Sequence, residues 1–155
     1  DPRRGVATID TANTQGVAAH FSEAPAHQLS VLGLRSGNDF GALMAVSLDD
    51  RPLAQSKRVL LQYATRSRPT GWRDQPATLT LPGGAQRPGR EVVSIGQPPW
   101  RVEQPLLQVS LRNTALRRAT ALDMNGLPVA EVPLRRRADG VHLRFPPGTM
   151  YLVLR

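Results

Sequence analysis

The chain has 155 residues, of which 40% are hydrophobic, and it carries a formal net charge of +8 at pH 7. This length suits one domain with a packed core, and the apolar content excludes a disordered chain. The absence of cysteine excludes a disulfide framework and a thiolate metal site, and no stretch approaches the ~20 apolar residues of a membrane-spanning helix. The 14 prolines and 13 glycines are scattered along the chain, which predicts short strands joined by turns.

The first part of the chain contains three short stretches with the character of strands. Residues 6–10 and 15–21 are apolar runs, separated by a polar turn at residues 11–14. Residues 28–34 follow, and they end before the turn-forming segment 36–39. We expect each of the three stretches to form one strand.

Residues 42–48 and 58–66 form the most regular pattern in the chain. A polar tip at residues 49–52 separates the two apolar runs. In the second run, every second residue from Val59 to Thr65 falls on one face. This period of two favours a strand over a helix, so we expect an antiparallel pair whose second strand buries one face.

The remaining strands are shorter and are separated by proline and glycine. Further strands are predicted at residues 77–81, 92–95, 100–103, 106–111, 129–134, 141–145 and 150–154, with a turn at Gly83-Gly84. Residues 117–124 fit a strand or a short helix, and we favour the strand because residues 123–126 give a strong hairpin signal. About a dozen strands predict an all-β, two-sheet antiparallel β-sandwich, jelly-roll or immunoglobulin-like, in which residues 1–155 form a single domain.

Arginine accounts for nearly all of the positive charge, since Lys57 is the only lysine among the 20 basic residues. We expect most of these arginines to lie on solvated strand faces. A surface for nucleic acid would combine clustered arginines with stacking aromatic residues. The tightest cluster, Arg135-Arg136-Arg137, has no aromatic residue beside it. We therefore expect no nucleic-acid partner, and no membrane partner either.

The sequence contains no recognisable catalytic or metal-binding pattern. The three histidines His20, His27 and His142 share no ligand spacing, and no nucleophile motif is present. Five aspartates lie at predicted turns, where aspartate usually caps its own backbone. They are Asp49, Asp50, Asp74, Asp123 and Asp139. We expect a protein that is not an enzyme and that has no cofactor.

Two tryptophans stand apart from the patterned strands. Trp72 ends a Pro-Thr-Gly loop and Trp100 follows a Pro-Pro pair. Each either plugs one end of the sandwich or presents its flat apolar face to a sugar ring or a partner protein. For the second case we predict a carbohydrate-binding set of Trp72 and Trp100, with Arg73 and Tyr63 as hydrogen-bonding neighbours.

Residues 47–53 read SLDDRPL and residues 56–59 read SKRV, directly after an apolar run. This segment resembles the C-terminal β-sandwich domains of bacterial glycoside hydrolases, in which an apolar strand leads into Ser-Leu-Asp-Gly-x-Pro-Leu and then Ser-(Lys/Arg)-Arg-aliphatic. Two departures from the pattern are Asp50 in place of the turn glycine and Pro69 where asparagine is common. Aspartate tolerates the left-handed conformation that such a turn requires.

Other segments are similar to the same family over most of the chain. They are Thr70-Gly71, the hairpin at residues 121–126, residues 131–134 and the opening strand and turn at residues 6–16. The resemblance implies a non-catalytic accessory domain of a polysaccharide-active enzyme, which binds a polysaccharide or oligosaccharide or buttresses a catalytic domain of the same polypeptide. The start at Asp1-Pro2, without an initiator methionine, leads us to expect a mature form or a piece of a longer protein, secreted or periplasmic.

Two other classes of function stay open. The first is an adhesion or assembly module that recognises protein, for which a large apolar patch would be the mark. The second is a small independent hydrolase, which would need two carboxylates that converge in a cleft.

Overall fold

The computed structural model describes residues 5–155, which form sixteen strands and no helix. The all-β prediction is confirmed. The described chain divides into two compact units, of which unit 1 holds the residues up to Thr65 and Gln104–Arg155, and unit 2 holds Arg66–Glu103. No helix among the described residues has the length and hydropathy needed to cross a membrane.

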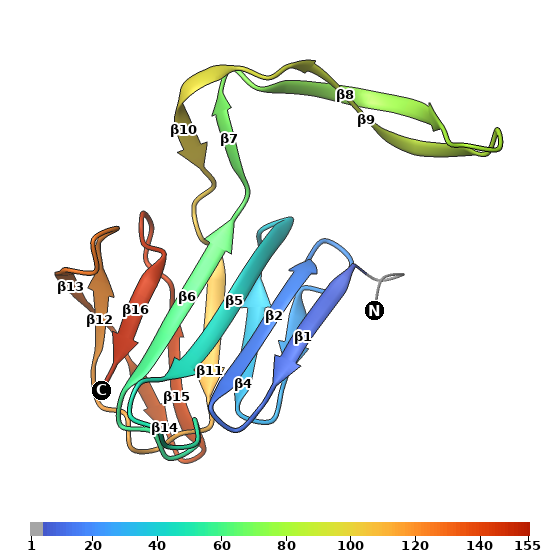
Figure 1. The fold of residues 1–155 in the computed structure, drawn as a ribbon. Coiled ribbons are helices and arrows are strands. Elements are labelled where there is room, and N and C mark those ends of the chain that lie inside the picture. Colours follow the sequence, from blue (N-terminus) through green and yellow to red (C-terminus); the bar gives the residue numbers. More distant parts are fainter. Residues whose placement is uncertain (1–4) are drawn as a thin grey trace. The chain divides into compact units, whose positions relative to one another are not determined.

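Unit 1 is built from a seven-stranded and a five-stranded antiparallel sheet (Figure 1). The order in the larger sheet is β1 (Val6–Asp10), β2 (Thr14–His20), β5 (Phe40–Ser47), β6 (Val59–Thr65), β16 (Tyr151–Leu154), β12 (Ala119–Leu122), β13 (Pro128–Val132). The order in the smaller sheet is β14 (Arg135–Arg137), β15 (Gly140–Arg144), β11 (Leu107–Leu111), β4 (Leu32–Ser36), β3 (Ala26–Gln28). Apolar residues from both sheets form one buried core, which makes unit 1 a β-sandwich.

The predicted central pair is confirmed by strands β5 and β6. Their register runs from Gly41 opposite Thr65 to Ser47 opposite Val59. Val59 and Leu61 are fully buried, as the period of two requires. The hairpin predicted at residues 123–126 is also confirmed, because it joins β12 to β13.

The tip between β5 and β6 is held by the carboxylate of Asp49. It accepts hydrogen bonds from the Ser56 hydroxyl at 2.7 Å, the Lys57 N–H at 2.8 Å and the Ser47 hydroxyl at 3.0 Å. The bond from Ser56 has the largest effect, and together these bonds lower the pKa of Asp49 to about 2. The next residue, Asp50, has φ of 58°, the left-handed conformation expected for it.

The stretch predicted as one strand at residues 28–34 is two strands, and that prediction is wrong. A tight turn separates β3 from β4, with the N–H of Leu29 donating to the carbonyl of Leu32. The buried side chain of Gln15 holds this turn, because its amide oxygen accepts the N–H groups of Val31 and Leu32 at 3.0 and 2.8 Å. A partner so distant in the sequence leaves no trace in the local pattern.

Unit 2 consists of two two-stranded ribbons that interrupt the sandwich between β6 and β11. Strand β7 (Ser67–Thr70) pairs with β10 (Gln97–Val102), and β8 (Arg73–Thr80) pairs with β9 (Gln86–Ser94). The predicted turn at Gly83-Gly84 is confirmed, with both φ angles positive. No residue of unit 2 is fully buried. Strands β7 to β10 therefore lie outside the two main sheets, in a compact unit of their own.

We predict that Leu61→Asp unfolds unit 1, because the change places an uncompensated charge in the core. The expected loss of unfolding free energy is about 4 kcal/mol or more. The control is Gln62→Asp, which puts the same charge on the exposed neighbour. Thermal unfolding followed by circular dichroism separates the two variants. A cooperative transition for Leu61→Asp near that of the parent would contradict the burial of this face.

We predict that Asp49→Asn lowers the melting temperature at pH 7. The folded state favours the ionised carboxylate, so its contribution is complete above the unfolded pKa of about 4 and is lost as pH falls to about 2. The difference in melting temperature between the parent and Asp49→Asn should therefore disappear as the pH falls over that range. Asp50→Asn is the matched control, because asparagine also accepts the left-handed conformation. A gap that stays constant with pH would rule out this role for the Asp49 charge.

Candidate functional site

Both tryptophans of the predicted binding set lie in unit 2. Trp100 lies on β10 opposite Pro69 of β7, and 62% of its surface is exposed. The hydroxyl of Thr70 donates to the carbonyl of Pro99 at 2.7 Å, which ties the segment before Trp100 to β7. Trp100 thus lies on a strand of unit 2 that belongs to neither of the two sheets of unit 1.

Trp72 is partly buried by contacts within unit 2. Its indole N–H donates to the Asp74 carboxylate at 3.0 Å, and the guanidinium carbon of Arg68 lies 4.4 Å from a ring centroid. This cation–π contact covers one face of the indole. Trp72 therefore presents less free ring surface than Trp100 does.

Asp74 connects Trp72 to the β8–β9 ribbon. The guanidinium of Arg90 on β9 donates to the Asp74 carboxylate at 2.8 Å. This bond, together with that of the Trp72 indole, holds the pKa of Asp74 below its usual value. We had predicted Asp74 at a turn, and this is wrong, because it lies on β8 and pairs across the ribbon.

The other two predicted residues have very different surroundings. Arg73 is exposed on β8, and its guanidinium makes no hydrogen bond or ion pair among the described residues. Tyr63 is 1% exposed in the core of unit 1, where its hydroxyl contacts Ser36 Oγ at 2.9 Å and donates to Asn38 Oδ1 at 3.1 Å. We therefore correct the expectation for Tyr63, which is a core residue. Its alternation with Val59 and Leu61 already indicated this face.

Two of the turn aspartates hydrogen-bond to the backbone of their own turns. Asp49 caps the β5–β6 tip, and Asp123 accepts the N–H groups of Asn125 and Leu127, both at 2.8 Å. The capping predicted for these two residues is confirmed. Within residues 5–155, no group of three His, Asp or Glu side chains is placed to hold a metal ion.

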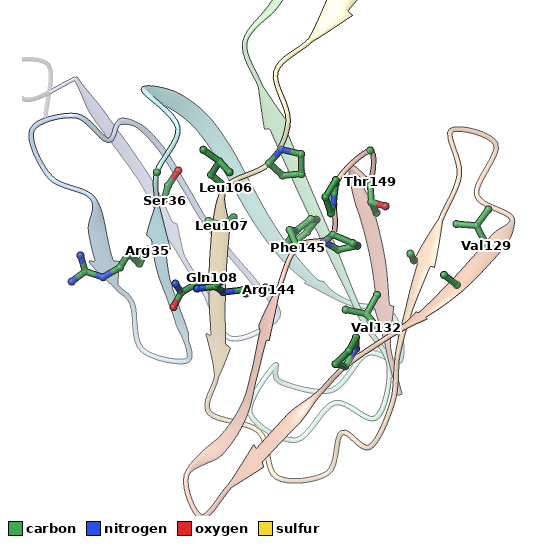
Figure 2. A pocket seen from close by; sticks show the side chains of 18 of the residues that line it. Arg35, Ser36, Leu106, Leu107, Gln108, Val129, Val132, Arg144, Phe145 and Thr149 are labelled. Atoms are coloured by element: carbon green, nitrogen blue, oxygen red, sulfur yellow. The ribbon is translucent and has the colours of Figure 1, made fainter.

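A cleft of about 950 Å³ opens at one end of the sandwich in unit 1 (Figure 2). Its walls are mainly apolar, with Val129 and Val132 from β13, Leu107 from β11 and Phe145 after β15. Glu131 is the one carboxylate among the described residues that line it. Without a second carboxylate, the cleft lacks the pair that glycoside hydrolysis requires.

A second hollow of about 850 Å³ lies over the five-stranded sheet of unit 1. Arginines from three strands line it: Arg35 on β4, Arg144 on β15, and Arg135 and Arg137 on β14. Sequence reasoning identified only the run 135–137. Arg35 and Arg144 could have been found from the alternation of β4 and β15, because on each strand the arginine occupies an exposed position next to core residues.

Comparisons of the chain with protein-family models, with curated proteins and with solved structures find no match. The resemblance to glycoside hydrolase domains therefore rests on the motifs of the sequence. The fold agrees with the coarser part of that resemblance, an all-β sandwich with two main antiparallel sheets.

We predict that the two tryptophans differ in exposure to solvent. The chain has no others, so Trp72→Phe leaves Trp100 as the only indole, and Trp100→Phe leaves Trp72. The Trp72→Phe variant should emit at longer wavelength and be quenched more strongly by acrylamide, because Trp100 is exposed and Trp72 is covered by Arg68. Steady-state fluorescence measures both properties. Equal quenching of the two variants would contradict the placement of Trp100.

Proposed function

We propose that the chain is a non-catalytic accessory module of a polysaccharide-active enzyme and that it binds carbohydrate through Trp100. The observation that carries the proposal is the 62% exposure of this indole, on a ribbon that has no core to cover it. The motifs shared with glycoside hydrolase domains and the β-sandwich of unit 1 support the module class. This function implies a secreted or periplasmic protein that works with a catalytic domain of the same polypeptide.

The chemistry of the indole suits a pyranose ring. Stacking the ring face against the C–H face of a sugar buries apolar surface on both sides. At ~25 cal/mol/Å² the contact contributes on the order of 1–2 kcal/mol, so two such platforms by themselves reach about millimolar affinity. Arg73 offers charge-assisted hydrogen bonds to sugar oxygens, and Trp72 offers the ring face that Arg68 leaves open.

A second candidate function is recognition of a protein. Exposed apolar side chains are spread over unit 2, including Leu79 at 43%, Val93 at 52% and Ile95 at 72%. A two-stranded ribbon without a core is marginal in water, and exposed apolar surface of this kind marks contact sites. A catalytic domain in the same polypeptide or an assembly partner would cover it.

The test is affinity electrophoresis and calorimetry against a panel of neutral and acidic glycans. We expect Trp100→Ala to weaken binding by about tenfold, the loss that corresponds to 1.4 kcal/mol, and Trp72→Ala to weaken it less. The control is Val102→Ala, which removes exposed apolar surface from the same strand without removing an indole. Equal binding by the parent and Trp100→Ala would refute the site. A parent that binds no glycan would favour the protein-recognition candidate.

A further inference from the structure

The outer face of the five-stranded sheet carries positive charge that the fold itself does not use. On β11, Leu107, Val109 and Leu111 are buried, so Gln108 and Ser110 point away from the core. The same alternation turns Arg35 of β4 and Arg144 of β15 outward, and both are exposed. The face therefore consists of residues that the packing of the core forces to the surface.

The register of the strands aligns these residues in rows. Gln108 lies opposite Arg35 on one side and opposite Arg144 on the other, and Figure 2 shows the three on neighbouring strands. Since adjacent strands are about 4.8 Å apart, the backbones of Arg35 and Arg144 are separated by about 10 Å. In the next row, Arg135 lies opposite His142. The arginines are thus distributed along a surface rather than gathered at one point.

This surface is hollowed rather than flat. Its cavity of about 850 Å³ extends across all five strands, from Ala26 of β3 to Arg137 of β14. Gly33 lies in its floor, where an added Cβ would be 2.4 Å from Ser110 Oγ and 2.5 Å from Gln28 Oε1. The lack of a side chain at Gly33 leaves room for a hydroxyl and an amide that face the hollow.

The positive charge of the hollow is not neutralised from within the described protein. Its lining includes no carboxylate among residues 5–155, and none of Arg35, Arg135, Arg137 and Arg144 forms an ion pair there. The carboxylate of Asp139 lies 3.8 Å from His142 Nε2, and Glu131 lines the other cleft, which shares Arg35 and Arg144 with this hollow. Several like charges on one sheet face repel each other, and a bound anion would offset that repulsion.

We propose that this arginine face, defined by Arg35, Arg135, Arg137 and Arg144, binds an anionic polysaccharide that carries carboxylate or sulfate groups. The planar fork of arginine matches both groups, and Gln28, Gln108 and Ser110 supply partners for sugar hydroxyls. A cavity that crosses several strands suits a chain with repeated charges better than a small anion. The described lining contains no Trp, Tyr or Phe ring, which disfavours single-stranded nucleic acid, whose bases stack on such rings.

This inference shares with the proposed function only the premise that the chain binds polysaccharide. The arginine face belongs to unit 1, and Trp100 belongs to unit 2. Substitutions at one site leave the residues of the other site unchanged. The two hypotheses therefore fail separately.

The test compares Arg35→Gln/Arg144→Gln with the charge-matched control Arg58→Gln/Arg118→Gln. All four arginines are exposed in unit 1, and the control pair lines neither cavity. Binding is measured by calorimetry and affinity electrophoresis with polygalacturonate, dextran sulfate, uncharged dextran and a single-stranded oligonucleotide. Thermal unfolding of each variant confirms that it is folded.

We expect the parent to bind polygalacturonate, dextran sulfate or both, and to bind dextran more weakly. Arg35→Gln/Arg144→Gln should lose at least about tenfold in affinity, while the control loses less than about twofold, because charge-assisted hydrogen bonds are lost only in the first. Preference between the two polyanions identifies the carboxylate or the sulfate as the recognised group.

Three outcomes would overturn the inference. Equal losses of affinity in both double variants would show that the overall charge of +8, and not the arginine face, causes the binding. Tighter binding of the oligonucleotide than of either polyanion would assign the face to nucleic acid. Binding of uncharged dextran alone, lost in Trp100→Ala, would leave the proposed function standing and remove this site.

Discussion

The structure depends on the burial of one side of each strand between the two sheets of unit 1. In the smaller sheet, Val109 lies opposite Leu34 and Leu143, and all three are buried. Because successive side chains of a strand point to opposite sides, this apolar row fixes the direction of the adjacent row on the outer face. The positions of the arginines on the outer face are therefore a geometric consequence of the core.

Buried polar side chains complete the sandwich where strands leave it. The amide of Asn38 donates to the carbonyl of Gln104, and its oxygen accepts the N–H of Leu106. These bonds fix the chain where it returns from unit 2. Asn113 acts in a similar way and donates to the carbonyls of Leu53 and Ser56, both at 2.7 Å. Such fully bonded polar groups specify one arrangement of the loops in an otherwise apolar core.

Unit 2 is held together by a different kind of interaction. Without a buried core, it relies on ladder hydrogen bonds and on local contacts such as Arg68 over Trp72 and the Asp74–Arg90 ion pair. Its exposed apolar and aromatic residues contribute little to its own stability. The buried core of the described chain therefore lies entirely in unit 1.

Local pattern in the sequence determined the strands, their faces and several turns. The alternation from Val59 to Thr65, the hairpin at residues 123–126 and the left-handed Asp50 each depend on neighbouring residues, and each was predicted correctly. The buried position of Tyr63 was also contained in that alternation, although we expected the residue at a binding site. The exclusion of Arg66–Glu103 from the sandwich had no such local signal, because strand patterns occur in ribbons as well as in sheets.

Only the tertiary structure decided which distant residues meet. Gln15 divides the stretch at residues 28–34 into two strands through hydrogen bonds to Val31 and Leu32. Arg35 and Arg144 are far apart in the chain and become neighbours of Gln108 only through the order of the strands. Sequence alone determines the period of a strand and hence its two faces, because sterics act between adjacent residues. Strand order is decided by the packing of the whole core, and it is this order that assembles scattered arginines into one surface.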